Sequence, residues 1–200
     1  MNFLAHIFLA QQSDEAMIGA LLGDFVKANL GEQYPRAVEA EILLHRQVDV
    51  YTDAHQIVKD ALQTFEASRR RYAGIVLDVF YDHLLAKNWS TYSAVPLDVF
   101  VQRFYDALGK HESLLPPKLV EVMPRMIAQD WLGSYLDFSG VEVAINRTSQ
   151  RLSRNGHLLR EGLLDLRENY AVLEDGFRMF FPDLMRFVAL HRTSVENAQA

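Results

Sequence analysis

Apolar residues recur three and four positions apart along most of this chain, whereas strict alternation of apolar and polar residues is scarce. This spacing is typical of helices that bury one face, and breakers fall between the periodic stretches. The sequence therefore predicts an all-α fold. The expected helices span residues 14–29, 35–52, 54–70, 72–88, 96–108, 117–135, 141–153 and 158–181, followed by a short helix after Pro182.

The length of 200 residues suits one sizeable domain, and no linker, repeat or low-complexity segment divides it. Short connections, of about 2–8 residues, favour antiparallel helices packed as a bundle. We therefore expect residues 1–200 to form a single-domain helical bundle.

Composition narrows the possible functions. The chain has no cysteine, which excludes disulfides, thiolate zinc sites and a cysteine nucleophile. Acidic residues outnumber basic ones, 26 to 20, and this balance argues against a nucleic-acid partner. No apolar run approaches the roughly 20 residues of a membrane span, and the apolar start lacks the basic lead of a signal peptide. We expect a cytoplasmic protein that binds neither nucleic acid nor membrane.

Potential metal ligands stand in the apolar stretches of the first half of the chain. Asp24 lies between Leu-Leu-Gly and Phe-Val, and His45 and Asp49 are four residues apart, as neighbours on a helix are. Asp78, Asp82 and His83 follow in equally apolar surroundings, and His6 is a possible seventh member. Imidazole and carboxylate together suit Mn²⁺, Fe²⁺, Zn²⁺ or Mg²⁺, and a cation would offset the cost of burying these groups.

A structural interpretation competes with the metal site. A single His–Asp pair four residues apart is more often a solvated contact or a satisfied core pair than a ligand pair. Several such positions on apolar helices together shift the balance toward a site. Sequence spacing cannot show whether the helices bring these pairs together.

The same segments carry a family resemblance. The segments Met1–His6, Gly23–Val26, His45–Asp53 and Asp78–Leu84 resemble the acyl carrier protein phosphodiesterases, bacterial enzymes related to the HD-domain metal phosphohydrolases. The resemblance extends over most of the chain, to Tyr170–Glu174 and Phe180–Pro182.

The resemblance implies removal of the 4′-phosphopantetheine group from holo acyl carrier protein, an HD-like helical fold and a divalent metal. Mn²⁺ is the favoured ion, with Mg²⁺ or Fe²⁺ as alternatives. One departure matters, because HD-domain enzymes carry adjacent ligands in the order His-Asp, whereas this chain has Asp82-His83. The choice of ligands among Asp78, Asp82 and His83 therefore stays open.

A mechanism follows from these residues. Asp24, His45, Asp49, Asp78 and Asp82 are the candidate metal ligands, and the cation would activate the attacking water. His83 or His6 would protonate the leaving serine oxygen, and Arg46 would steady the phosphoryl charge, unless Arg46 is only a solvated salt-bridge partner.

Acyl carrier proteins are strongly acidic, so an acidic enzyme needs local basic patches to bind them. Arg69, Arg70 and Arg71 precede the segment that contains Asp78, and they are the favoured docking residues. A second patch consists of Arg147, Arg151, Arg154 and Arg160. Either run could also be an ordinary solvated face.

Two other functions remain open. The same metal site could serve a nucleotide or cyclic-dinucleotide phosphohydrolase, because HD-like chemistry does not itself choose the leaving group. The chain could also be a non-enzymatic helical binding module whose His and Asp residues pair internally.

Overall fold

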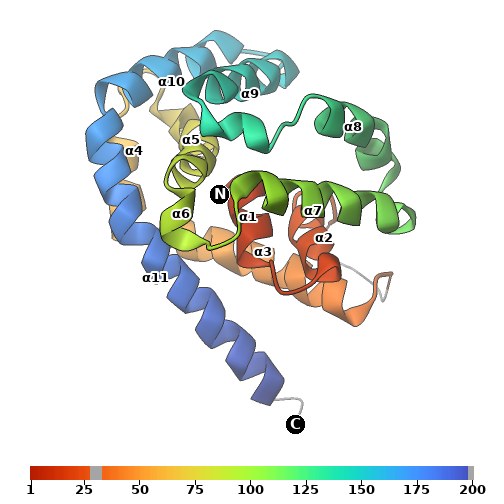
Figure 1. Cartoon of the computed structure of the whole chain (residues 1–200). Coiled ribbons are helices and arrows are strands. Elements are labelled where there is room, and N and C mark those ends of the chain that lie inside the picture. Colours follow the sequence, from red (N-terminus) through yellow and green to blue (C-terminus); the bar gives the residue numbers. More distant parts are fainter. Residues whose placement is uncertain (28–32, 198–200) are drawn as a thin grey trace.

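Helices form the whole regular structure of the part of the chain that the computed structural model describes, residues 1–27 and 33–197 (Figure 1). The all-α prediction is confirmed, and no strand occurs in these two ranges. The α-helices are α1 Phe3–Leu9, α2 Asp14–Leu22, α3 Arg36–Ala54, α4 Gln56–Gln63, α5 Ala73–Lys87, α6 Trp89–Tyr92, α7 Leu97–Lys110, α8 Pro117–Ala128, α9 Phe138–Arg151, α10 Gly156–Glu168 and α11 Tyr170–Asn197. Short 3₁₀ turns occur at η1 Arg70–Tyr72, η2 Glu112–Leu114 and η3 Gly133–Leu136.

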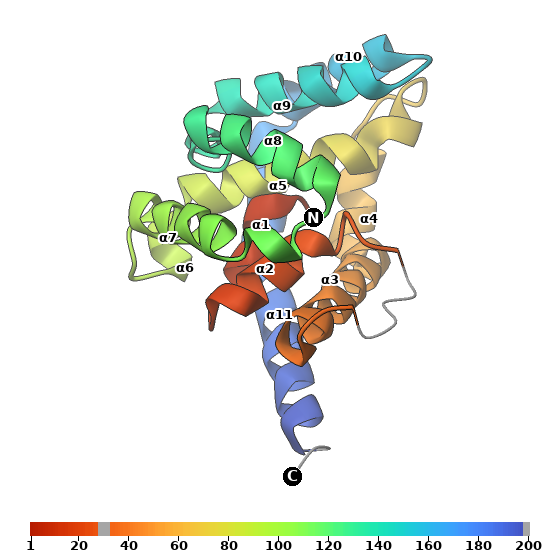
Figure 2. The ribbon, with the colours of Figure 1, turned by 90° about the vertical axis from the view of Figure 1, so that its right-hand side faces the viewer.

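Helix α5 lies at the centre of the bundle. Figures 1 and 2 show α1, α2 and α3 on one side of it and α9 and α10 on the other, while α11 runs along the flank. The sequence of α5 explains this position, because Val76, Phe80 and Leu84 are fully buried and its apolar residues surround the helix. A helix that is apolar all round is stable only when other helices cover it.

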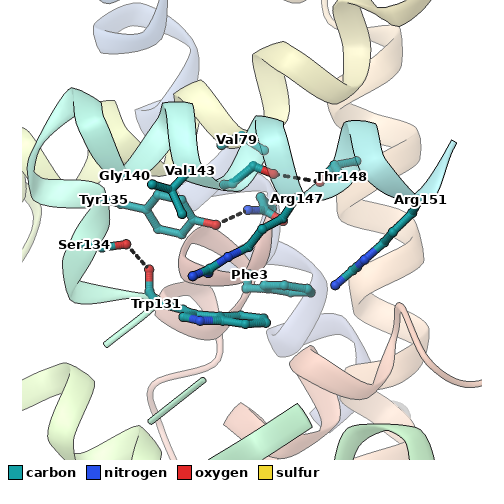
Figure 3. Close-up of a pocket in the computed structure, with 12 residues that line it drawn as sticks. Phe3, Val79, Trp131, Ser134, Tyr135, Gly140, Val143, Arg147, Thr148 and Arg151 are labelled. Atoms are coloured by element: carbon teal, nitrogen blue, oxygen red, sulfur yellow. Dashed lines mark hydrogen bonds between the residues drawn. The ribbon is translucent and has the colours of Figure 1, made fainter. Parts of the chain in front are cut away.

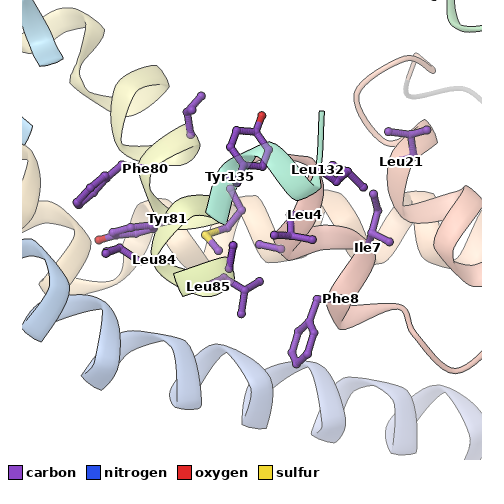
Figure 4. Packing of buried hydrophobic residues seen from close by; sticks show 14 of the residues in the cluster. Leu4, Ile7, Phe8, Leu21, Phe80, Tyr81, Leu84, Leu85, Leu132 and Tyr135 are labelled. Carbon is purple, nitrogen blue, oxygen red and sulfur yellow. The ribbon is translucent and has the colours of Figure 1, made fainter. Parts of the chain in front are cut away.

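One hydrophobic cluster joins the helices from α1 to α11. Leu4 and Phe8 of α1 and Leu84 and Leu85 of α5 all belong to this cluster (Figure 4). This shared core holds the helices of the bundle together. None of the described helices combines the length and apolar character that crossing a membrane requires.

Helix beginnings follow their local sequence. Ser13 caps α2, where its side-chain oxygen accepts a hydrogen bond from the amide of Ala16 at 3.1 Å. Pro35 and Pro96 stand directly before α3 and α7. Helix α2 ends at Leu22, earlier than predicted, and the last two predicted residues, 28 and 29, lie outside the described ranges.

The prediction that Pro182 ends a helix is wrong. Helix α11 continues through it to Asn197, and the preceding break falls instead at Asn169, between α10 and α11. Proline removes one backbone hydrogen bond from a helix. Phe181 and Leu184 on either side of it are fully buried, so tertiary packing outweighs that loss.

Candidate metal centre

Four predicted ligands converge from three parts of the N-terminal region. His6 lies on α1, His45 and Asp49 lie one turn apart on α3, and Asp24 follows the end of α2. The Nε2 atom of His45 is 3.3 Å from Asp49 Oδ2 and 3.6 Å from Asp24 Oδ1. His6 Nε2 is 3.1 Å from Asp49 Oδ1. Ligand atoms of His6, His45 and Asp49 all lie within 4.8 Å of one another.

The ring of His45 is fixed by the backbone of α2. Its Nδ1 donates a hydrogen bond to the carbonyl oxygen of Ala20 at 2.7 Å. This bond places the proton on Nδ1 and turns Nε2 toward the carboxylates of Asp24 and Asp49, which is the usual arrangement of a metal-binding histidine.

Gly23 has no side chain, and the His45 ring occupies the space where a Cβ atom would stand. A Cβ atom at this position would stand 2.2 Å from Cγ of His45, far inside van der Waals contact. The backbone of Gly23 is ordinary right-handed helix, with φ −51° and ψ −36°. Glycine is therefore required here for close approach rather than for an unusual conformation.

Arg46 supports the segment that follows Asp24. Its guanidinium donates hydrogen bonds to the carbonyl oxygens of Val26 and Lys27, at 3.1 and 3.0 Å. Arg46 therefore ties this segment to α3, next to the two ligand candidates on that helix. The phosphoryl contact expected for Arg46 stays a prediction, and these two bonds show that its guanidinium also contacts the backbone of this segment.

His6 is buried against His45. The two imidazole rings stack with centroids 3.6 Å apart and an angle of 13° between their planes. The His6 Nε2 atom is buried and has no partner with hydrogen-bond geometry in the described part of the chain. A buried nitrogen without a hydrogen bond is costly, and a metal ion would satisfy it.

Asp78 joins the group through the amino group of Met1. That nitrogen lies 3.0 Å from Asp78 Oδ1 and 3.5 Å from Asp49 Oδ1. Burial lowers the pKa of this amino group, but the carboxylates of Asp78 and Asp49 outweigh burial and raise it. The carboxylates therefore favour a positive charge at this point.

Burial and neighbouring charges also shift the pKa values of His45, His6 and Asp49. Burial disfavours the charged form of His45, but Asp24 and Asp49 outweigh this effect and raise its pKa to about 9. Burial lowers the pKa of His6 to about 4, so this ring is neutral near pH 7 and its nitrogen lone pair is available. Burial also opposes the charge of Asp49, yet His45 and His6 hold the pKa of that carboxyl well below its usual range. The cluster thus combines a neutral imidazole with an ionised carboxylate.

The donor set fits a divalent cation. Two imidazole nitrogens and the carboxylates of Asp49 and Asp24 are borderline and hard ligands, of the kind that Mn²⁺, Fe²⁺ and Zn²⁺ accept. The unsatisfied Nε2 of His6 and the oriented Nε2 of His45 point to the same conclusion.

Asp82 has a different role from the one predicted. Both of its oxygens accept hydrogen bonds from the backbone of α1, from Leu4 N at 2.8 Å and Ala5 N at 3.0 Å. Asp82 is fully buried and satisfies free amides in the first turn of α1, where a negative charge is favourable. Burial raises its pKa to about 7, although these two amides favour the ionised form. Asp82 is an anchor for the helix that carries His6, and the assignment as a metal ligand is corrected.

His83 also lies outside the cluster. Its Nδ1 donates to the carbonyl oxygen of Tyr135 at 2.8 Å, and its Nε2 pairs with the hydroxyl of Tyr170 at 2.7 Å. Because adjacent residues on a helix point in directions about 100° apart, His83 faces α11 and η3 while Asp82 faces α1. Both ring nitrogens are engaged there, so the predicted role of His83 as a proton donor is corrected to a structural one.

The triple arginine, Arg69, Arg70 and Arg71, mostly forms contacts within the protein. Arg69 forms a bidentate pair with the buried Asp165, with Nε–Oδ2 and Nη2–Oδ1 distances of 2.5 and 3.0 Å. Arg70 donates hydrogen bonds to the carbonyl oxygen of Phe65. Arg71 lies over the ring of Tyr72, 5.0 Å from its centroid, and is exposed. Two of the three predicted docking cations are thus committed to internal contacts.

Several features of the centre have no signal in the sequence. The carbonyl of Ala20 and the amino group of Met1 are backbone groups, and their role depends on how the helices pack. Gly23 carries a weak signal, because a glycine beside a candidate ligand indicates close approach of another group.

Comparison with known proteins identifies the family of the chain. No solved structure matches the chain significantly. Residues 1–184 match the family model described as acyl carrier protein phosphodiesterase. Proteins with that name from Enterobacter sp. (strain 638), Salmonella agona (strain SL483) and Escherichia coli O157:H7 are each 36% identical over 186 residues, covering 92% of this chain and 96% of the relative. The chain belongs to the acyl carrier protein phosphodiesterase family.

Proposed function

We propose that the protein hydrolyses the phosphodiester bond between 4′-phosphopantetheine and a serine of acyl carrier protein, which returns the holo form to the apo form. Membership of the acyl carrier protein phosphodiesterase family supports holo acyl carrier protein as the substrate. The observation that carries the chemistry is the convergence of His6, His45 and Asp49, whose ligand atoms lie within 4.8 Å of one another.

We assign the cation-binding role to His6, Asp24, His45 and Asp49, with Asp78 as a further carboxylate beside them. Mn²⁺ is the proposed ion, because a mixture of nitrogen and oxygen donors suits it better than Mg²⁺, which prefers oxygen. Fe²⁺ has similar preferences. When bound, the ion supplies an activated water and neutralises charge on the phosphoryl oxygens.

The protein's own groups prepare this site. Ala20 and Gly23 hold the His45 ring in one orientation, and the His6 ring stacks against one face of it. Arg46 holds the segment after Asp24 against α3. These contacts fix the donor atoms before the substrate arrives, and such preorganisation reduces the cost of reaching the transition state.

The test is incubation of the purified protein with holo carrier and Mn²⁺, followed by mass spectrometry of the carrier. The expected result is loss of the prosthetic arm and recovery of the unmodified serine. A panel of nucleotides and cyclic dinucleotides belongs in the same assay, since turnover of these with no change in the carrier would replace the proposal with the nucleotide alternative.

A matched pair of variants on α3 isolates the centre. Asp49→Asn removes a ligand candidate, whereas Asp53→Asn removes an exposed carboxylate one turn further along the same helix. We expect Asp49→Asn to lower turnover by about a hundredfold or more and Asp53→Asn to leave it near wild type, with equal helical content. Equal activity of the two variants would remove the metal centre from the mechanism.

The binding-module alternative makes a separate prediction. A cation that binds only the folded state raises its stability by about 2.7 kcal/mol at a hundred times its dissociation constant. A melting temperature that does not respond to Mn²⁺ would therefore favour a non-enzymatic module. We place the reaction in the cytoplasm, a reducing compartment that suits a chain without cysteine.

A further inference from the structure

Three arginines form a positively charged surface on α8 and α9. Arg125 and Arg151 are exposed, and Arg147 between them is partly buried. Burial lowers the pKa of Arg147, and the charges of Arg125 and Arg151 lower it further, so the three cations act on one another. We refer to Arg125, Arg147 and Arg151 as the α9 arginine surface.

In the described part of the chain, none of the three arginines forms an ion pair. Arg147 instead donates to the neutral amide oxygen of Gln129 at 2.7 Å and lies over the ring of Trp131, 4.6 Å from its centroid. Uncompensated guanidinium groups at an exposed face are suited to an acidic ligand. In contrast, Arg69 is paired internally with Asp165.

A pocket opens beside this surface. It has a volume of about 100 Å³, and Arg147 and Arg151 line it together with Phe3 and Trp131. Figure 3 shows both arginines extending from α9 toward these two aromatic rings. The opening therefore has charged groups along one edge and aromatic surface along the other.

The pocket and the candidate metal centre share segments of the chain. Phe3 stacks on Phe25, with ring centroids 6.3 Å apart, and Phe25 directly follows Asp24. Val79, which also lines the pocket, directly follows Asp78. Asn2 lines the pocket as well, and the amino group of the preceding Met1 lies 3.0 Å from Asp78 Oδ1.

We propose that the α9 arginine surface is the docking site for the acidic carrier protein. This inference rests on the proposed function and adds the surface that recognises the substrate. The whole chain has a net charge of −6, so its overall field repels an acidic partner. Because salt screens charges over about 8 Å, the local arginines determine the attraction at contact.

The test compares two double charge reversals that change the net charge equally. Arg125→Glu with Arg151→Glu alters the proposed surface at its two exposed positions. Lys59→Glu with Arg71→Glu alters an exposed cation on α4 and the exposed member of the triple arginine. Circular dichroism and the Mn²⁺-induced melting shift check that both variants are folded and bind the ion.

Two readouts are measured for each variant. The first is affinity for apo carrier by titration calorimetry at low and high salt, and the second is kcat/KM for release of the prosthetic arm. We expect the Arg125/Arg151 variant to lose about tenfold or more in both, mainly through KM, with a flatter salt dependence. The Lys59/Arg71 variant should stay within about twofold of wild type.

Each outcome decides a separate question. Wild-type behaviour of the Arg125/Arg151 variant, or an equal loss in both variants, would overturn the docking site. A wild-type protein that leaves holo carrier intact in Mn²⁺ would overturn the proposed function. Apo carrier binding that falls only in the Arg125/Arg151 variant would support the docking site even then, because that readout needs no turnover.

Discussion

Substitution of Gly23 by alanine tests whether the position of His45 determines cation binding. In most helices this change is favourable by about 0.4–1 kcal/mol, because alanine loses less conformational freedom on folding. The backbone at Gly23 is right-handed helix and accepts alanine without strain. The backbone contribution alone would therefore predict a small gain in stability.

Packing predicts the opposite. The new Cβ would stand 2.2 Å from Cγ and 2.5 Å from Nδ1 of His45, whereas ordinary contact begins near 3.4 Å. The ring must therefore move by about 1 Å, and such a displacement can cost about a hundredfold at a preorganised site. The move also disturbs the bond from His45 to the carbonyl of Ala20. Overpacking costs about 1–3 kcal/mol, which outweighs the backbone gain.

The assay is thermal unfolding with and without Mn²⁺. At a concentration that stabilises wild type by about 2.7 kcal/mol, a hundredfold loss of affinity leaves about 0.4 kcal/mol. Gly74→Ala is the matched control, because a Cβ at that exposed position on α5 meets no atom within 4 Å. It should keep the full Mn²⁺ effect and raise stability slightly.

A Gly23→Ala variant with the wild-type Mn²⁺ shift and wild-type turnover of holo carrier would refute the reasoning. It would mean that His45 binds no ion, or that the ring moves without consequence. A Gly74→Ala variant that also lost the Mn²⁺ shift would point to a general effect of the substitution.

Three further predictions concern stability. Asp165→Ala should lower the unfolding free energy by about 3 kcal/mol, because Arg69 keeps its partly buried charge without the bidentate partner. Urea titrations measure this loss, and a value below about 1 kcal/mol, as for surface pairs, would contradict the prediction. Arg192→Met should lower the unfolding free energy by about 2–3 kcal/mol. Glu41 is only 6% exposed, and this change removes the guanidinium that pairs with it and joins α11 to α3. Adding Glu41→Leu should recover most of that loss, and no recovery in the double variant would exclude an unpaired charge as its cause. Burial lowers the pKa of His83 below its ordinary value of 6.5, so the unfolded chain binds a proton at this ring more readily than the folded chain does. The folded state should therefore keep its full stability above pH 6.5 and lose stability as the pH falls below that value. His83→Gln should make that fall shallower in chemical unfolding at several pH values, and an unchanged slope would show that His83 does not contribute.

The helical fold could be predicted from sequence because periodicity reports which face of each helix is buried. Local rules failed where distant residues decide the outcome. Pro182 is a helix breaker by itself, yet it lies within α11 because Phe181 and Leu184 are packed in the core. The sequence does not show that Arg69 pairs with a buried carboxylate, because only the packing of α10 places Asp165 beside it.

The positions of the ligand candidates could be predicted only in part, for the same reason. His45 and Asp49 share one helix face, so their proximity follows from the spacing of four residues. Asp78 and Asp82 have the same spacing, but Asp82 bonds to amides of α1, nearly eighty residues earlier in the chain. Helical spacing shows which residues are neighbours on one helix, and it does not show which other helix they face.

The ligand candidates His6, Asp24, His45 and Asp49 all belong to the first quarter of the chain, where α2 and α3 pack closely together. An ion bound there would join α1 and α3 directly, without contributions from α9 or α10. Local opening of this N-terminal unit should therefore be suppressed by the ion, so that its amide protons exchange more slowly with solvent deuterium, while those of α9 and α10 gain no such direct protection.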